Sequence, residues 1–216
     1  MQTRPLRNIV LFACFALSLT FCQTDKSPAF SDEEIEKVQE REKAIPAEKD
    51  EERPFTFYYQ QLVVALASGD HAGFNSLIHP EFGCYLIEAP GAIPVITRIT
   101  NVDKALRKGS ERLIMNFNDV FLTFPLTEES LPTIDCDSPA GFYSKEGTYV
   151  EDVNNLAEEK IWKYIGLDSA AQKPISELAS TVEKTIVNTA GFTAYFSKIG
   201  AEWYITFFDI RVPCTA

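Results

Sequence analysis

The sequence predicts an α+β domain in which N-terminal helices pack on a curved, mainly antiparallel sheet. Apolar residues recur at helical spacing over residues 54–78, and stretches rich in β-branched and aromatic residues begin at residue 84. A long aromatic hairpin closes the chain over residues 192–212. Residues 54–216 have the length of one ordinary domain and contain no internal repeat, so we expect a single domain there, preceded by a signal peptide and a charged linker.

The start of the chain has the layout of a secretory signal peptide. Arg4 and Arg7 precede an uncharged, largely apolar run over residues 9–21. A transmembrane helix needs about 20 apolar residues, and this run is shorter. We therefore expect residues 1–21 to be removed as a signal peptide.

Cys22 stands at the end of this apolar run, and polar residues follow it at once. Residues 19–22, Leu-Thr-Phe-Cys, resemble a bacterial lipobox, although Phe21 occupies a position where a small residue is usual. The resemblance implies cleavage before Cys22 and acylation of this cysteine, and two or more acyl chains give stable membrane attachment. Lipidation at Cys14 and an ordinary secretory peptide are the alternatives.

A lipid-anchored protein of the bacterial cell envelope is thus expected. Because Gln23 rather than an aspartate follows Cys22, the resemblance favours the outer membrane over the inner one. Beyond residue 21 the chain carries 18 basic and 31 acidic residues, a net charge of −13. Such a surface repels phosphate groups, so nucleic acid is excluded as a partner, and membrane contact is expected through the lipid alone.

Residues 22–53 are expected to form a flexible tether. After the cysteine they are rich in charge and almost free of large apolar side chains, so they cannot bury enough surface to fold. A flexible linker of this length spans on the order of 30 Å.

Two helices open the domain. Pro54 suits the first position of a helix whose apolar residues recur until Gly69, a natural stop. Asp70 is placed to cap a shorter second helix that ends at Pro80. A helical hairpin is therefore predicted.

Strands are predicted next, over residues 84–87, 93–99 and 113–124. A third helix is predicted over residues 153–165, because its apolar residues share one face, acidic residues precede it and Gly166 follows it.

The closing hairpin is predicted to pair residues 192–198 with residues 203–212 across a turn at Gly200. Strict alternation would place Trp203, Ile205, Phe207 and Asp209 on one face of the last strand. Tyr204, Thr206, Phe208 and Ile210 would lie on the other. Both faces are largely apolar, so we expect this strand to be covered on both sides.

This order of elements resembles the nuclear transport factor two-like fold. Residues 57–77 are similar to the way such domains begin, and residues 200–205 are similar to their last strand. The resemblance implies a cone of curved antiparallel sheet closed by helices, and a homodimer formed through the sheet. The helix at residues 153–165 departs from the pattern. Since such folds serve both enzymes and binding modules, the fold does not decide function.

His71 and His79 are the only histidines, and no cluster with metal-ligand spacing and no glycine-rich phosphate loop is present. We therefore expect no metal and no cofactor. His71 follows a turn and is expected to be exposed. His79 precedes Pro80 and either packs at the helix end or serves as a proton acceptor at the mouth of the cone.

Asp209 is a carboxylate on an otherwise apolar face of its predicted strand, beside Phe207 and Ile205. In a cavity, desolvation would raise its pKa and suit it to general acid or base catalysis. The structural interpretation is a strand-end residue satisfied by Arg211 or water.

Three cysteines remain beyond the signal region. We predict a disulfide between Cys136 and Cys214, which would contribute about 4 kcal/mol by closing a long loop, and we place Cys84 in a strand core. Asp135 and Asp137 flank Cys136 but supply too few oxygen ligands for a calcium loop.

Two functions follow from these observations. The first is a non-catalytic lipoprotein domain that binds an envelope protein or a small apolar ligand. The second is a cavity enzyme of isomerase or dehydratase type that uses Asp209 or His79. A deep pocket that holds both residues would favour the enzyme.

Overall fold

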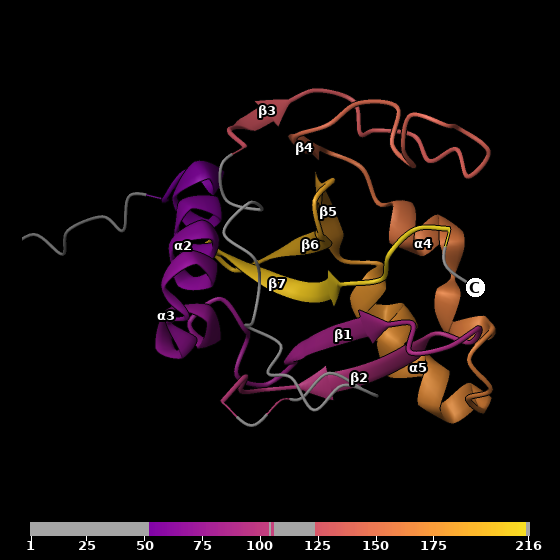
Figure 1. Ribbon diagram of the computed structural model, residues 1–216. Helices are drawn as coiled ribbons and strands as arrows, with labels where there is room; N and C mark the ends of the chain where they lie inside the picture. The colour runs from indigo at the N-terminus through magenta and orange to yellow at the C-terminus, as the bar shows by residue number, and fades with distance from the viewer. Residues whose placement is uncertain (1–51, 104, 106–123, 215–216) are drawn as a thin grey trace, which may run out of the picture. The chain divides into compact units, whose positions relative to one another are not determined.

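The computed structural model describes residues 52–103, 105 and 124–214 (Figure 1). The predicted signal peptide, Cys14, Cys22, all but the end of the linker, and nearly all of the strand predicted at residues 113–124 lie outside the described residues. None of the helices in the described part of the chain is long and apolar enough to cross a membrane.

A seven-stranded mixed sheet forms the centre of the described domain, and the predicted α+β class is confirmed. The strand order is β2-β1-β7-β6-β5-β4-β3. Four neighbouring pairs are antiparallel, whereas β1 with β7 and β3 with β4 are parallel. The strands are β1 (Cys84–Glu88), β2 (Val95–Ile99), β3 (Leu126–Glu128), β4 (Thr148–Glu151), β5 (Val182–Asn188), β6 (Phe192–Ile199) and β7 (Glu202–Asp209).

The predicted helical hairpin is present as α2 (Phe55–Ser68) and α3 (His71–Asn75). Pro54 is the N-cap of α2 rather than its first residue, because its ψ of 149° is extended. Gly69 ends the helix with a φ of 64°, and the Asp70 side chain accepts a hydrogen bond at the start of α3.

The second helix is shorter than predicted and ends at Asn75 instead of near Pro80. Two turn-type bonds follow, and the Leu77 carbonyl then accepts a hydrogen bond of 2.8 Å from the Ile205 amide of β7. Because this carbonyl accepts its hydrogen bond from the sheet, it does not accept one from a further turn of helix. Leu77 and Ile78 are nevertheless buried, as their apolar character predicted.

The helix predicted over residues 153–165 is wrong as one element. Of its expected acidic start, Glu151 belongs to β4 and Asp152 follows that strand, and the rest of the segment divides into α4 (Asn155–Glu159) and a 3-10 turn, η2 (Ile161–Lys163). The break lies at Lys160, whose φ of 48° is left-handed and ends α4. A further helix, α5 (Ser169–Ala179), and strands β3, β4 and β5 were not predicted.

The closing hairpin is confirmed as β6 and β7, but the predicted faces of β7 change part of the way along the strand. Tyr195 pairs with Phe207, whereas the next residue of β6 pairs with Ile205, so Thr206 is an extra residue in β7. Trp203 and Ile205 therefore share a core with Phe208 rather than with Phe207. The alternation predicted for Phe207 and Asp209 is wrong because a bulge reverses it.

Both faces of the sheet are covered, as predicted from the apolar character of β7. Helices α2 and α3 lie against one face, and α4 and α5 lie on the other side (Figure 1). The bulge places Phe207 and Asp209 on the α4 and α5 side. This side carries the candidate site.

Candidate functional site

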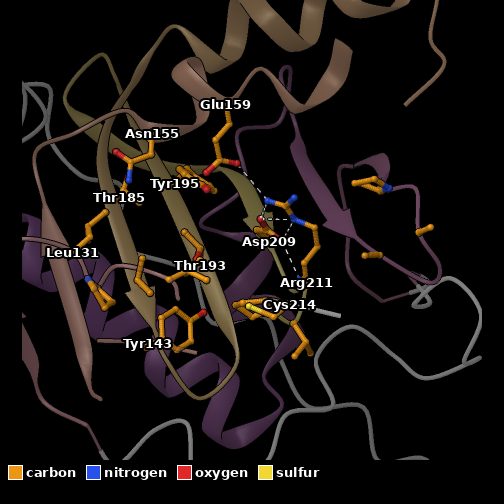
Figure 2. A pocket seen from close by; sticks show the side chains of 18 of the residues that line it. Leu131, Tyr143, Asn155, Glu159, Thr185, Thr193, Tyr195, Asp209, Arg211 and Cys214 are labelled. Atoms are coloured by element: carbon orange, nitrogen blue, oxygen red, sulfur yellow. Dashed lines mark hydrogen bonds and ion pairs between the residues drawn. The ribbon is translucent and has the colours of Figure 1, made fainter. Parts of the chain in front are cut away.

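A pocket of about 380 Å³ opens on the α4 side of the sheet, with three neighbouring strands as its floor (Figure 2). Thr185 of β5 pairs with Tyr195 of β6, and Thr193 of β6 pairs with Asp209 of β7. These four polar side chains therefore lie next to one another across the three strands. The row gives the pocket floor hydrogen-bonding groups, of which the Thr185 hydroxyl already donates to the Val153 carbonyl at 2.7 Å.

The pocket walls come from segments that are distant in the sequence. Asn155 and Glu159 stand four residues apart on α4 and therefore share one face of that helix. The segment after β1, the loop that follows β3 and the tail that follows β7 form the other walls. Their lining residues are Ala89, Gly91, Ala92, Pro94, Leu131, Pro132, Ile134, Tyr143, Val212, Pro213 and Cys214.

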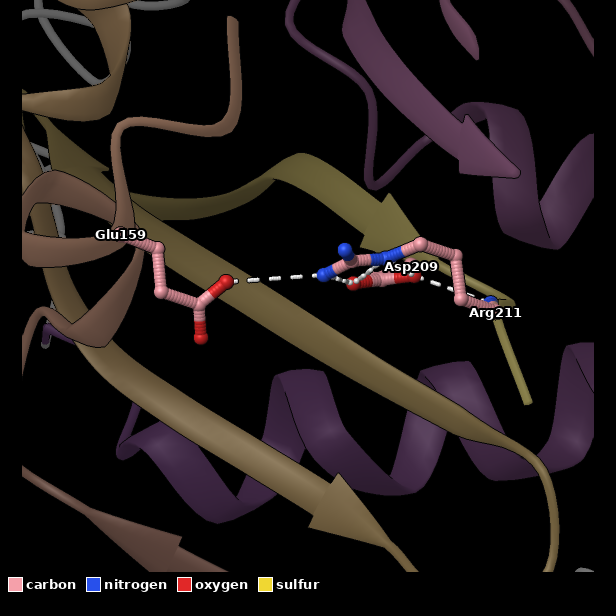
Figure 3. Close-up of polar contacts among 3 residues, drawn as sticks. All are labelled: Glu159, Asp209 and Arg211. Atoms are coloured by element: carbon pink, nitrogen blue, oxygen red, sulfur yellow. Dashed lines mark hydrogen bonds and ion pairs between the residues drawn. The ribbon is translucent and has the colours of Figure 1, made fainter. Parts of the chain in front are cut away.

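Asp209 and Arg211 form a close ion pair at the edge of this floor (Figure 3). The Asp209 carboxylate accepts four hydrogen bonds, all from Arg211. Its Oδ1 accepts from the backbone amide at 2.9 Å and from Nε at 3.0 Å, and its Oδ2 accepts from Nε at 2.9 Å and from Nη2 at 2.6 Å. Asp209 is only 6% exposed, and Arg211 supplies the partner that a buried carboxylate requires. Asp209 is therefore a residue at the strand end whose carboxylate is satisfied by Arg211, which is the structural interpretation of the sequence.

Glu159 approaches the same guanidinium from α4. One carboxylate oxygen lies 3.5 Å from the Arg211 Nη2, and the other points away from Arg211 (Figure 3). The Glu159 side chain is half exposed. Burial raises the pKa of Glu159, while the Arg211 charge opposes that rise. With all three groups ionised, the cluster carries two negative charges and one positive charge.

Two tyrosines complete the polar lining. Tyr195 is 3% exposed, and no described residue forms a hydrogen bond with its hydroxyl. Burial raises the pKa of Tyr195 well above its usual value, and the charges of Asp209 and Glu159 raise it further. Burial and the Asp209 charge also raise the pKa of Tyr143. Both phenols therefore stay neutral at ordinary pH and can donate or accept a hydrogen bond.

The predicted disulfide between Cys136 and Cys214 is present, with a Cα–Cα distance of 5.4 Å. Cys214 lines the pocket, and Cys136 belongs to the loop that carries Ile134 and Tyr143. The bond therefore joins two pocket walls. Cys84 is a fully buried free thiol in β1, where burial raises its pKa.

The histidines lie outside the pocket lining. His79 Nδ1 accepts from the backbone amides of Glu81 and Phe82, each at 3.2 Å, and its ring stacks on Phe82. It thus organises the turn before β1. His71 forms an exposed ion pair of 2.9 Å with Asp103. The structure does not bring His79 together with Asp209, and the described residues contain no group of side chains suited to a metal ion.

Sequence reasoning identified Asp209, its partner Arg211 and the disulfide, but it missed Glu159, Tyr143 and the rest of the polar floor. One signal was present: Thr185, Thr193 and Asp209 are polar residues that each stand next to an apolar residue of their strand. Their convergence depends on strand register, which the sequence did not give.

No family model matches the chain, and no curated protein or solved structure matches it significantly.

Proposed function

We propose that this chain is a lipid-anchored protein of the bacterial cell envelope whose domain binds a small ligand in the pocket above β5, β6 and β7, without catalysis. The observation that carries the proposal is a pocket whose floor presents hydrogen-bonding groups while its buried carboxylate is fully engaged. Asp209 accepts four hydrogen bonds from Arg211, which holds it as a fixed part of the wall.

The alternative is a cavity isomerase or dehydratase that uses Asp209 or His79. A general base must lie within hydrogen-bond reach of the proton it removes and must have a free lone pair. The lone pairs of Asp209 face Arg211, and His79 is not among the pocket residues. The cysteines of the wall are joined in a disulfide, and Cys84 is not part of the lining. These positions favour binding over catalysis.

The residues that line the pocket also indicate how polar its ligand is. Its floor and one wall carry threonine, tyrosine, carboxylate and guanidinium groups, which favour a polar ligand. The apolar character expected from the sequence is found at Ile134 and Val212, which line the pocket and are more than half exposed. A ligand with a polar group and a short apolar part fits both features.

Saturation-transfer NMR with a library of small soluble molecules tests the proposal on the mature protein in detergent. Thr193→Ile places a larger apolar side chain on the pocket floor and should abolish the signals of true ligands. Thr97→Ile makes the same change on β2, outside the pocket, and should leave them intact. Ligands that bind the Thr193→Ile variant as well as the unaltered protein would contradict the proposal.

The membrane anchor is a separate part of the proposal and rests on the lipobox-like residues that end at Cys22. Attachment to the outer membrane, the tether over residues 22–53 and the cone-like fold similar to nuclear transport factor two-like domains belong to the same proposal. Intact mass spectrometry of membrane extracts should give a chain that starts at Cys22 with acyl chains attached. An unmodified mature chain would contradict the anchor and leave the pocket proposal standing.

A homodimer through the sheet is also proposed on the fold resemblance, and an envelope protein as partner is proposed on the expected tether and the acidic charge. Sedimentation of the detergent-solubilised protein at several concentrations measures the first directly. A monomer at all concentrations would contradict the dimer.

A further inference from the structure

The charges at the pocket are unequal, and this imbalance points to the ligand. Arg211 is the one basic residue in the pocket lining, whereas Asp209 and Glu159 are both acidic. Since Asp209 already holds the guanidinium through both carboxylate oxygens, the Arg211 charge is neutralised before any ligand arrives. The remaining charge of the pocket is negative.

Glu159 is the carboxylate that is left available. It contacts Arg211 through one oxygen at 3.5 Å, a longer separation than the 2.6 Å contact between Asp209 and the same Nη2 atom. Its second oxygen points away from Arg211 (Figure 3) and has no hydrogen-bond partner among the described residues. A carboxylate oxygen in this position accepts a hydrogen bond from a charged donor.

Tyr195 provides an independent sign of a missing polar partner. Tyr195 lines the pocket and is 3% exposed, and its hydroxyl lacks a hydrogen bond to any described residue. Buried hydroxyls in folded proteins nearly always have a partner. The hydroxyl can accept an N–H from a ligand, and the nearby ring of Tyr143 offers an aromatic surface to a cation.

An anion fits this site poorly. To reach Arg211 it would have to approach a guanidinium that has Asp209 on one side and Glu159 on the other, and both carboxylates would repel it. A cation is attracted by the same two groups. The net charge of −13 beyond residue 21 adds to this preference at longer range.

We infer that the pocket binds a small organic ammonium ion, with its N–H groups donated to Glu159 and Tyr195 and its apolar part against Ile134 and Val212. The inference rests on the proposed binding function and names the ligand class for that site. A volume of about 380 Å³ suits a compact molecule of this kind.

Three probes that share a tert-butyl group and differ in charge test the inference by calorimetric titration of the mature protein in detergent. They are tert-butylammonium, tert-butanol and pivalate. We expect tert-butylammonium to bind at least fivefold more tightly than tert-butanol, and pivalate to bind more weakly than both. The order is set by charge, because the apolar part is the same in each probe.

Glu159→Gln should weaken tert-butylammonium binding about tenfold, since it removes the charge-assisted hydrogen bond while keeping the side-chain shape. The matched control is Glu158→Gln on the same helix, because Glu158 is exposed and does not line the pocket. Tyr195→Phe removes only one hydroxyl and should weaken tert-butylammonium binding about threefold without affecting the apolar contact.

The outcomes separate the inference from the proposed function. Tighter binding of pivalate, an unchanged affinity in Glu159→Gln, or library ligands that lack a cationic nitrogen would overturn the ammonium inference and leave the binding function in place. If no probe and no library molecule binds in a manner sensitive to Thr193→Ile, the binding function itself fails.

Discussion

The ion pair of Asp209 and Arg211 should be costly to break. Asp209 is 6% exposed, and the Arg211 side chain is 28% exposed. Removing one partner of a buried pair costs about 3 to 5 kcal/mol, because the other charge stays buried alone. Arg211 is partly solvated and the pocket admits water, so we expect Arg211→Gln to cost about 2.5 kcal/mol.

A double-mutant cycle isolates this contact from the rest of each side chain. Asp209→Asn keeps the shape and removes the charge, and Arg211 retains Glu159 as a partner, so this change should cost about 1 kcal/mol. The double variant leaves no unpaired buried charge and should cost about 1.5 kcal/mol. The resulting coupling between the two residues is about 2 kcal/mol.

Urea unfolding at pH 7, with the disulfide intact, measures the four free energies of the cycle. Lys173→Gln is the control, because Lys173 pairs with Glu177 across 3.8 Å on an exposed helix face. This substitution should lower the free energy of unfolding by no more than about 0.5 kcal/mol. If the costs of the two single substitutions simply add in the double variant, the pair is not coupled and the reasoning is refuted.

Three further predictions concern stability. Reducing the bond between Cys136 and Cys214, which are separated by 78 residues, should lower the free energy of unfolding by about 4.5 kcal/mol; no change in the urea midpoint under reducing conditions would contradict this. Gly83→Ala should lower the free energy of unfolding by about 2 kcal/mol, because φ is +73° and a Cβ would lie 2.7 Å from a backbone oxygen. Gly69→Ala, whose Cβ would meet no atom within 4 Å, should lower it by about 1 kcal/mol. Equal urea midpoints of the two variants would refute the difference. Burial raises the pKa of Tyr195 above its usual value of 10.0, so Tyr195 ionises first in the unfolded chain, and the free energy of unfolding falls as pH rises above about 10. Urea unfolding between pH 9 and 11 should show a smaller fall in this free energy for Tyr195→Phe than for the unaltered protein. An identical fall would refute the reasoning.

Local patterns in the sequence were enough to predict the two opening helices and four of the seven strands. The apolar spacing before Gly69 and the capping position of Asp70 predicted α2 and α3, because helix signals act within a few residues. The strands β1, β2, β6 and β7 followed from runs of β-branched and aromatic residues. The burial of Cys84 followed from its place in such a run.

Periodicity was misleading where the backbone departs from a regular element. The apolar spacing over residues 153–165 predicted one helix, but the left-handed Lys160 divides it. The residues of α5 were not predicted as a helix, although Asp168 before them is a typical N-cap residue and its side chain caps the helix. The first miss came from a backbone conformation that apolar spacing does not describe, and the second from a capping signal that was overlooked.

The sequence by itself determined the class of fold, the acidic charge, the cysteine pair and the identity of Asp209 as an unusual residue. Only the tertiary structure decided the pocket. The extra residue at Thr206 turns Asp209 towards α4, and strand register then sets it beside Thr193. Glu159 reaches Arg211 from an element some fifty residues earlier in the chain. A site made from residues so far apart depends on register and packing, and a one-residue shift in a strand would turn its side chains to the opposite face.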